Sequence, residues 1–119
     1  YYCHRDTIDE SGVIIAKAEE DQTPSIVESW LADQISAYWG SMPGNIANVT
    51  LRREALDQVG GFDETMRVSG DFEMWVRIAS KYPIGFLNEP LMALRRHAGQ
   101  FSQMTGVILD FLKEDRRIY

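Results

Sequence analysis

Two carboxylates near the middle of the chain, Asp71 and Glu73, are the side chains best suited to move a proton. They open a segment, about residues 71–81, in which apolar residues recur at helical spacing. A helix N-terminus favours an ionised carboxylate, so Asp71 can either accept a proton from a bound hydroxyl or simply complement the helix. Glu73 points away from Asp71 on a helix, and we expect it to be a solvated or positioning group. A hydrolase that uses both acids is disfavoured, because neighbours on one helix cannot flank a bond from opposite sides.

A short basic cluster, Arg95-Arg96-His97, stands out in an otherwise acidic chain. It can attract an anionic ligand, or it can be the solvated end of a strand. Arg95 and His97 alternate along the predicted strand, so both side chains can lie on one face. A neutral imidazole can also ligate a metal, whereas a single histidine at a strand end is more often a hydrogen-bonded surface residue. Gln100 and Ser102 follow closely and can add polar contacts to the same ligand.

The scaffold for these residues is predicted to interleave strands and helices. Strands are expected at about 1–5, 13–18, 46–51, 84–87 and 91–95, and helices at about 24–38, 53–59, 71–81 and 103–117. Thr23 followed by Pro24 is the expected start of the first helix. Asn88-Glu89-Pro90 is the expected turn between the last two strands. Together these elements predict an α/β domain with a mixed sheet and flanking helices.

Length and charge limit the classes of protein that remain. The 119 residues suffice for a single domain or part of a larger one, and we expect the chain to begin at a fragment boundary because it opens on Tyr1 without methionine. The formal charge of −6 repels phosphate backbones, so no nucleic-acid partner is expected. The lone Cys3 excludes an internal disulfide and a cysteine zinc site. No apolar stretch approaches the roughly 18 residues that span a bilayer, so no transmembrane segment is expected.

Three segments follow one another in a specific order. The segments are Asn48-Val49-Thr50-Leu51-Arg52-Arg53-Glu54-Ala55-Leu56 running into Val59-Gly60-Gly61-Phe62-Asp63-Glu64, then Gly70-Asp71-Phe72-Glu73-Met74-Trp75-Val76-Arg77-Ile78-Ala79, and then Glu89-Pro90-Leu91 with Leu94-Arg95-Arg96-His97. Their order and spacing resemble those of non-processive family 2 glycosyltransferases over nearly the whole chain. The Gln-x-x-Arg-Trp signature of processive synthases does not occur here, which favours transfer of single residues.

The resemblance implies a partial GT-A fold, the fold of nucleotide-diphospho-sugar transferases, which is an α/β sandwich around one central sheet. Residues 1–119 would then be one domain, the C-terminal, acceptor-side part of the catalytic domain. In that family the N-terminal half binds the nucleotide and carries a D-x-D motif that holds Mn²⁺ or Mg²⁺. The segment Asp6-Thr7-Ile8-Asp9 has the wrong spacing for this motif. We therefore expect the nucleotide-binding half to be absent from this chain and the divalent metal to belong to the full-length parent.

The resemblance also assigns roles to individual residues. Asp71 would be the general base that deprotonates the acceptor hydroxyl in an inverting transfer, with Gly70 in place of the family's usual glutamate. Arg95 and His97 match an Arg-x-His element near the donor diphosphate or its metal, with His97 as a metal ligand. Asn45 lies in a loop that borders the family's acceptor pocket.

Further substrate contacts are expected from three side chains around these elements. Trp39 can stack on a sugar ring or lie buried in the core, and both interpretations stay open. Gln100 and Ser102 would complete the substrate-binding set.

The implied partners are a nucleotide-sugar donor and a glycan or lipid-linked acceptor, at the cytoplasmic side and membrane-associated in the full-length parent. We expect this chain alone to be inactive. The alternative is a non-catalytic module of the same fold that binds a glycan or a protein. A chain without its donor half would leave a sheet edge uncovered, so we also expect a homodimer or strand exchange, which light scattering would test.

Overall fold

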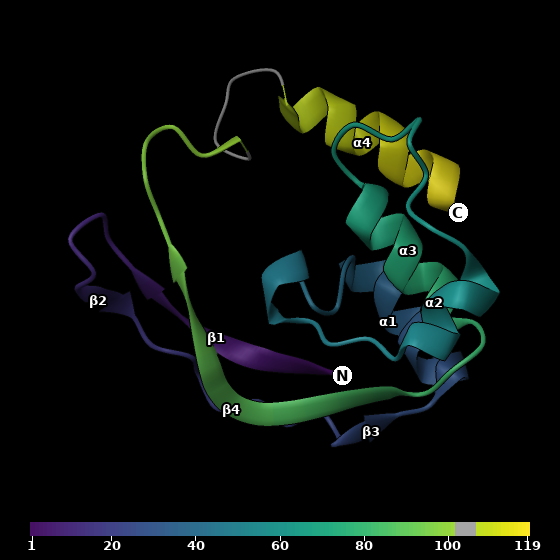
Figure 1. Ribbon diagram of the computed structural model, residues 1–119, viewed down its shortest axis with the longest axis horizontal. Helices are drawn as coiled ribbons and strands as arrows, with labels where there is room; N and C mark the ends of the chain where they lie inside the picture. Colours follow the sequence, from purple (N-terminus) through teal and green to yellow (C-terminus); the bar gives the residue numbers. More distant parts are fainter. Residues whose placement is uncertain (102–106) are drawn as a thin grey trace.

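The computed structural model describes residues 1–101 and 107–119, and in these residues four strands form one mixed sheet (Figure 1). The strands are β1 (Tyr2–Ile8), β2 (Ile14–Ala16), β3 (Ile26–Val27) and β4 (Ile84–Arg95), in the order β2-β1-β4-β3. β1 runs parallel to β4 and antiparallel to β2, and β3 pairs antiparallel with β4. The predicted α/β class with a mixed sheet is confirmed.

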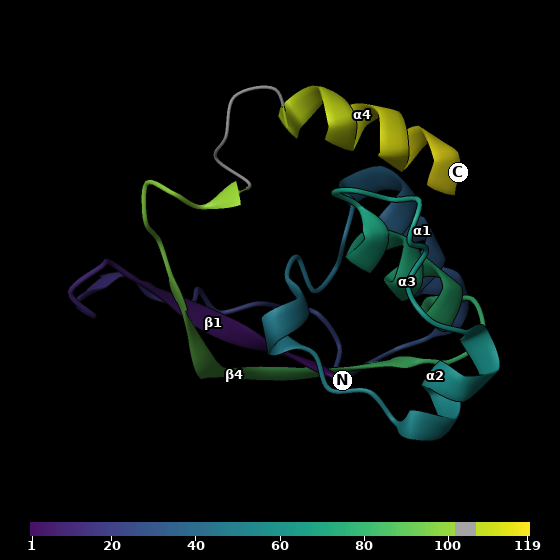
Figure 2. The same cartoon turned by 45° about the horizontal axis from the view of Figure 1, so that its top comes forward.

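The helices gather on one side of the bent β4 strand, with α4 outermost (Figures 1 and 2). They are α1 (Ser29–Trp39), the short 3₁₀ helix η1 (Ile46–Asn48), α2 (Arg53–Val59), α3 (Gly70–Ala79) and α4 (Val107–Ile118). α3 packs against α1, α2 and α4 and is therefore the central helix. The Tyr119 hydroxyl donates to the Asp33 carbonyl oxygen at 3.3 Å, which fixes the end of α4 to α1.

The buried core lies on both sides of α3. Met74, Trp75 and Ile78 form one cluster, and Ala79 joins Val27 of β3 and Ala32 of α1 in the other. These α3 residues recur at the spacing that keeps one helix face apolar. Their burial fixes the rotation of α3 and hence the direction of the side chains in its first turn.

The first predicted helix begins later than its capping signal indicates. Thr23 and Pro24 do not start a helix, and Glu28 is the N-cap of α1 instead. The intervening residues Ile26 and Val27 pair with Gly85 and Ile84 in the sheet. Long-range strand pairing therefore overrides the local capping signal at this position.

The last two predicted strands are one continuous strand, β4, and the turn expected at Asn88-Glu89-Pro90 is wrong. Pro90 lies opposite His4 of β1, and the register shifts on both sides of that pair. Proline is tolerated in a sheet at such irregularities because its missing N–H then interrupts no regular ladder.

The strand predicted at 46–51 is also wrong. Asn45 Oδ1 accepts the Ala47 N–H at 2.8 Å and caps η1, and of this segment only Val49 bridges to the sheet, opposite Tyr2. The helix predicted at 53–59 is confirmed, and those predicted near 71 and 103 are confirmed as α3 and, for the part the structure describes, α4.

Candidate active site

Asp71 lies in the first turn of α3, directly after the helix begins at Gly70. Its Oδ1 atom accepts the Phe72 backbone N–H at 2.8 Å. The helix-complementing role considered from the sequence is therefore present in the structure. The hydrogen bond from Phe72 occupies only Oδ1, so this role of Asp71 is compatible with proton transfer at Oδ2.

A cavity of about 500 Å³ contains Asp71 together with two other predicted site residues, Asn45 and Gln100. These three residues come from a helix start, a loop and the segment after β4, so the fold joins positions that are far apart in the sequence. The remaining lining includes both charged and apolar side chains. They are Arg5, Gly40, Ser41, Gly44, Val68, Ser69, Phe72, Leu94, Arg96, Phe101, Phe111 and Asp115.

Two arginines, Arg5 and Arg96, line this cavity. Arg5 was not predicted as a site residue, and Arg96 was considered only as part of the basic cluster that can attract an anion. The parallel register pairs Arg5 with Met92, so alternation along β4 places Arg96 on the same face of the sheet as Arg5. Arg5 Nη1 also donates to the Pro43 carbonyl oxygen at 3.0 Å, which ties the loop before Asn45 to β1. Sequence patterns could not reveal this pair, because its proximity depends on the register between β1 and β4.

Arg95 and His97 do not join Asp71 in its cavity. Arg95 Nη1 donates to the carbonyl oxygens of Asp9 and Glu10 at 2.8 and 2.7 Å, so it fastens the β1–β2 turn. His97 lines a separate cavity of about 370 Å³ beside that turn, and Arg96 lines both cavities. Arg96 is therefore the link between the two groups of predicted site residues.

The described residues do not by themselves fit a divalent cation. Among residues 1–101 and 107–119, no group of three or more His, Cys, Asp or Glu side chains could hold one. Asp9 and Glu10 line the same cavity as His97, and Asp9 uses its Oδ1 to accept the N–H groups of Ser11 and Val13, both at 2.9 Å. His97 as a metal ligand stays a prediction.

Trp39 is 87% exposed, so the interpretation of Trp39 as a core residue is wrong. It is not among the residues that line the Asp71 cavity, although Gly40 and Ser41 directly after it are. Stacking of its exposed ring on a sugar stays a prediction. Ser102 lies outside the residues that the structure describes.

Glu114 of α4 holds the loop that leads into α3, and sequence reasoning missed it. Its Oε1 accepts the Arg67 N–H at 2.8 Å, and its Oε2 accepts those of Val68 and Ser69 at 2.9 and 2.8 Å. Burial raises the pKa of the Glu114 carboxyl, but these hydrogen bonds and the nearby Arg117 outweigh that effect, so the pKa is lowered. No local pattern signals such a contact, because it joins segments about 45 residues apart.

Glu73 has the positioning role that the sequence allowed, because it pairs with Arg77. Arg77 pairs with Glu73 one turn away and donates to the carbonyl oxygens of Val59 and Gly61, the latter at 2.8 Å. Glu73 is thereby turned away from Asp71 and toward α2. The pair fastens α3 to the end of α2 and leaves Asp71 as the carboxylate of α3 that faces the cavity.

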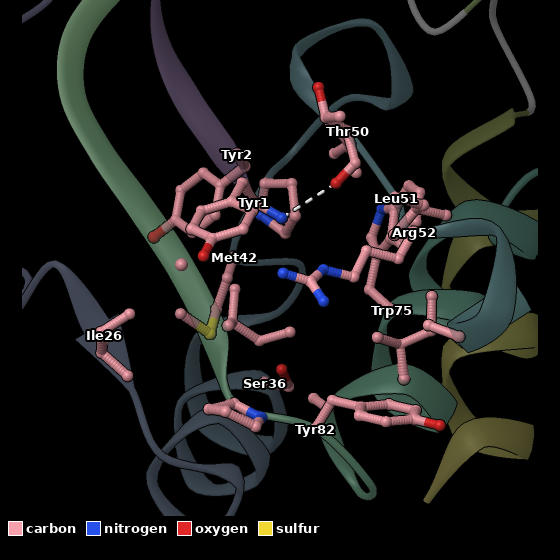
Figure 3. A pocket seen from close by; sticks show the side chains of 18 of the residues that line it. Tyr1, Tyr2, Ile26, Ser36, Met42, Thr50, Leu51, Arg52, Trp75 and Tyr82 are labelled. Atoms are coloured by element: carbon pink, nitrogen blue, oxygen red, sulfur yellow. Dashed lines mark hydrogen bonds between the residues drawn. The ribbon is translucent and has the colours of Figure 1, made fainter.

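A second cavity, of about 440 Å³, lies between the sheet and helices α2 and α3 (Figure 3). Tyr1, Tyr2, Met42, Trp75 and Tyr82 are among the side chains around it. The N-terminal amino group of Tyr1 donates to the Thr50 carbonyl oxygen at 2.9 Å at its edge. This cavity is dominated by apolar and aromatic groups and suits an apolar ligand more than acid–base chemistry.

The fold and the site together define a mixed α/β domain with a carboxylate at the start of a helix, in a cavity lined by both charged and apolar side chains. No protein-family model, curated protein or solved structure matches the chain. In the part of the chain that the structure describes, none of the helices combines the length and the apolar character needed to cross a bilayer.

Proposed function

We propose that this chain is the acceptor-side part of an inverting glycosyltransferase, with Asp71 as the general base. Two arguments support the proposal. The first is the ordered resemblance of three segments to family 2 glycosyltransferases. The second, and the one observation that carries it, is that Asp71 shares a cavity of about 500 Å³ with Asn45 and Gln100, two residues that were predicted to bind substrate.

The proposed chemistry is a single displacement. The acceptor hydroxyl donates a hydrogen bond to the Asp71 carboxylate, while its oxygen attacks the anomeric carbon of the donor sugar. A new carbon–oxygen bond forms, the bond to the nucleoside diphosphate breaks, and the hydroxyl proton passes to Asp71. The Phe72 N–H orients the carboxylate through its hydrogen bond to Oδ1, which leaves Oδ2 to accept the proton.

The other cavity residues have supporting roles in this proposal. Asn45 and Gln100 would hydrogen-bond hydroxyl groups of the acceptor. Arg96, which lines both cavities, would connect the acceptor site to the region of Arg95 and His97, where the resemblance expects the donor diphosphate. The nucleotide-binding residues and the D-x-D motif that holds Mn²⁺ or Mg²⁺ would belong to the donor half, and His97 would be the one metal ligand predicted from this chain.

The alternative function, a non-catalytic binding module, is favoured by the apolar cavity of about 440 Å³. Its aromatic lining could hold an apolar group or a segment of a protein without any reaction. On this alternative, the Asp71 carboxylate would only complement α3.

The experiment that separates the two functions uses the longest native protein that contains this chain. Transfer is assayed with a panel of sugar nucleotides in the presence of Mn²⁺ or Mg²⁺, and the anomeric configuration of the product is determined by NMR. Transfer with inversion supports the proposal. Transfer with retention, or binding of glycans without any turnover, would contradict it and favour the alternative.

A further inference from the structure

Helix α4 carries aliphatic residues on its outward face as well as on the face that it turns to the protein, where Val107 is buried and Phe111 and Ile118 are half-buried. Its aliphatic residues Ile108, Leu109 and Leu112 are 69%, 61% and 59% exposed. Its carboxylates Glu114 and Asp115 face the protein, where they accept hydrogen bonds from the 67–69 loop. A helix of a globular protein ordinarily buries its apolar stripe and exposes its charges. The outward face of α4 therefore presents an aliphatic strip that the described residues do not cover.

Cations share this outward face with the aliphatic residues. Lys113 and Arg116 are exposed, and they follow Leu109 and Leu112 at the i,i+4 spacing that places side chains next to each other. The remaining acid of the helix, Asp110, is turned to Arg67 at 3.1 Å. The outward face thus combines three aliphatic side chains with two positive charges, and all three acids of α4 bond to the protein instead.

We propose that α4 docks the protein on the surface of an anionic lipid bilayer, lying parallel to it with Ile108, Leu109 and Leu112 inserted among the headgroups. Aliphatic groups interleaved with Lys and Arg are the pattern of helices that bind at a bilayer surface. The two cations attract anionic headgroups. This inference does not rest on the proposed transferase function.

The size of the face favours a bilayer over a protein partner. A helix of 12 residues is about 18 Å long, so its outward strip covers on the order of 200 Å². A stable protein interface buries roughly 800 Å² on each partner. A bilayer needs no complementary shape, so a small strip with matching charge is sufficient for reversible binding.

The net charge of −6 opposes binding to an anionic surface, whereas Lys113 and Arg116 favour it. The distance of each charge from the bilayer decides which of the two effects prevails. Screening at physiological salt confines electrostatic effects to about 8 Å, so the charges of the outward face act most strongly. Docking would also bring the Asp71 cavity near the bilayer, because Phe111 and Asp115 of α4 line that cavity. The exposed aromatic residues Tyr38 and Trp39 end α1 directly before Gly40 and Ser41, which line the same cavity, and such rings suit a bilayer interface.

The test is sedimentation of the protein with vesicles, without any substrate. The vesicles are of phosphatidylcholine alone or with phosphatidylglycerol added. We expect about tenfold stronger binding to the anionic vesicles, and we expect this binding to decrease as the salt concentration rises.

Replacing both leucines (Leu109→Ser and Leu112→Ser) should weaken binding to the anionic vesicles about tenfold or more. Replacing both cations (Lys113→Gln and Arg116→Gln) should remove the preference for phosphatidylglycerol. Leu91→Ser, at a similarly exposed leucine of β4, is the matched control and should bind as the wild type does.

Three results would overturn the proposal. The first is failure of the wild type to sediment with anionic vesicles, and the second is equal binding by the wild type and the double leucine variant. The third is a dimer in light scattering that the leucine substitutions dissociate while vesicle binding is absent, which would assign the face to a second copy of the chain. Circular dichroism of each variant confirms that the fold is retained. Because no sugar nucleotide is present, failure of the transferase proposal would leave these results unchanged.

Discussion

The Glu114 carboxylate near the end of α4 accepts the Ser69 backbone N–H at 2.8 Å, two positions before Asp71. The same carboxylate holds the N–H groups of Arg67 and Val68. The last helix of the chain thereby fixes the approach to α3, on which the proposed base lies. The chemistry proposed at Asp71 therefore depends on a residue that lies far from it in the sequence.

Replacing Glu114 by glutamine is expected to lower the free energy of unfolding by about 1–3 kcal/mol, because an amide accepts fewer and weaker hydrogen bonds than a carboxylate. Urea denaturation measures the change. Asp110→Asn is the control, since its pair with Arg67 lies at the surface and should be worth less than about 1 kcal/mol. Equal losses in the two variants would contradict the special role of Glu114.

Acid should lower the free energy of unfolding by protonating the Glu114 carboxylate. The pKa of Glu114 is lowered in the folded state from its ordinary 4.5, so the stability it contributes is present above about 4.5. That contribution is lost as the pH falls through the lower, folded-state pKa. We expect the unfolding free energy to decrease below about pH 4.5, and to decrease less in Glu114→Gln. Parallel curves for the wild type and the variant would show that other groups carry the acid sensitivity.

The Tyr2 hydroxyl should ionise at a higher pH than an ordinary tyrosine does. Burial, followed by the nearby charge of Asp21, raises the pKa of its hydroxyl from 10.0 to about 12. A raised pKa in the folded state means that the associated stability is complete below pH 10 and is lost as the pH rises toward 12. Absorbance of tyrosinate near 295 nm, compared between the wild type and Tyr2→Phe, measures this step. A wild-type titration complete by about pH 10.5 would contradict the burial of this hydroxyl.

Arg77 is expected to be the most sensitive arginine for stability. Arg77→Ala removes its bonds to the Val59 and Gly61 carbonyl oxygens and to Glu73, and we expect a loss of about 2–4 kcal/mol. Arg53→Ala is the matched control, because its pair with Asp57 is largely exposed and should contribute less than about 0.5 kcal/mol. The two losses are compared by thermal unfolding, and similar values would contradict the account of how α2 is fastened to α3.

Local patterns in the sequence were sufficient to predict two of the helices. The helix at 53–59 and the start of α3 follow from apolar spacing and the glycines at 60 and 61. Long-range pairing decided the rest. Ile26 and Val27 joined β4 instead of a helix, and Pro90 was accommodated at an irregularity opposite His4. Neither outcome could be inferred without knowing which strands are neighbours.

The candidate site was predictable to a similar extent. Asp71, Asn45 and Gln100 were predicted and share one cavity, whereas Arg95 and His97 lie beside the β1–β2 turn. Arg5 was missed, and the position of Arg96 beside it was not predicted, since their shared face depends on the register between β1 and β4. The expected dimer and the donor-side metal remain predictions.

The most direct test of the central claim is the transfer rate of Asp71→Asn in the longest native protein, with donor affinity measured on the same preparation. Loss of a general base predicts a decrease of about 10²- to 10⁴-fold in kcat. Donor affinity should stay within about twofold, because the donor binds elsewhere, and Asp57→Asn on the exposed face of α2 should transfer normally. A kcat for Asp71→Asn within about threefold of the wild type would contradict the claim and leave Asp71 with only its structural role at the start of α3.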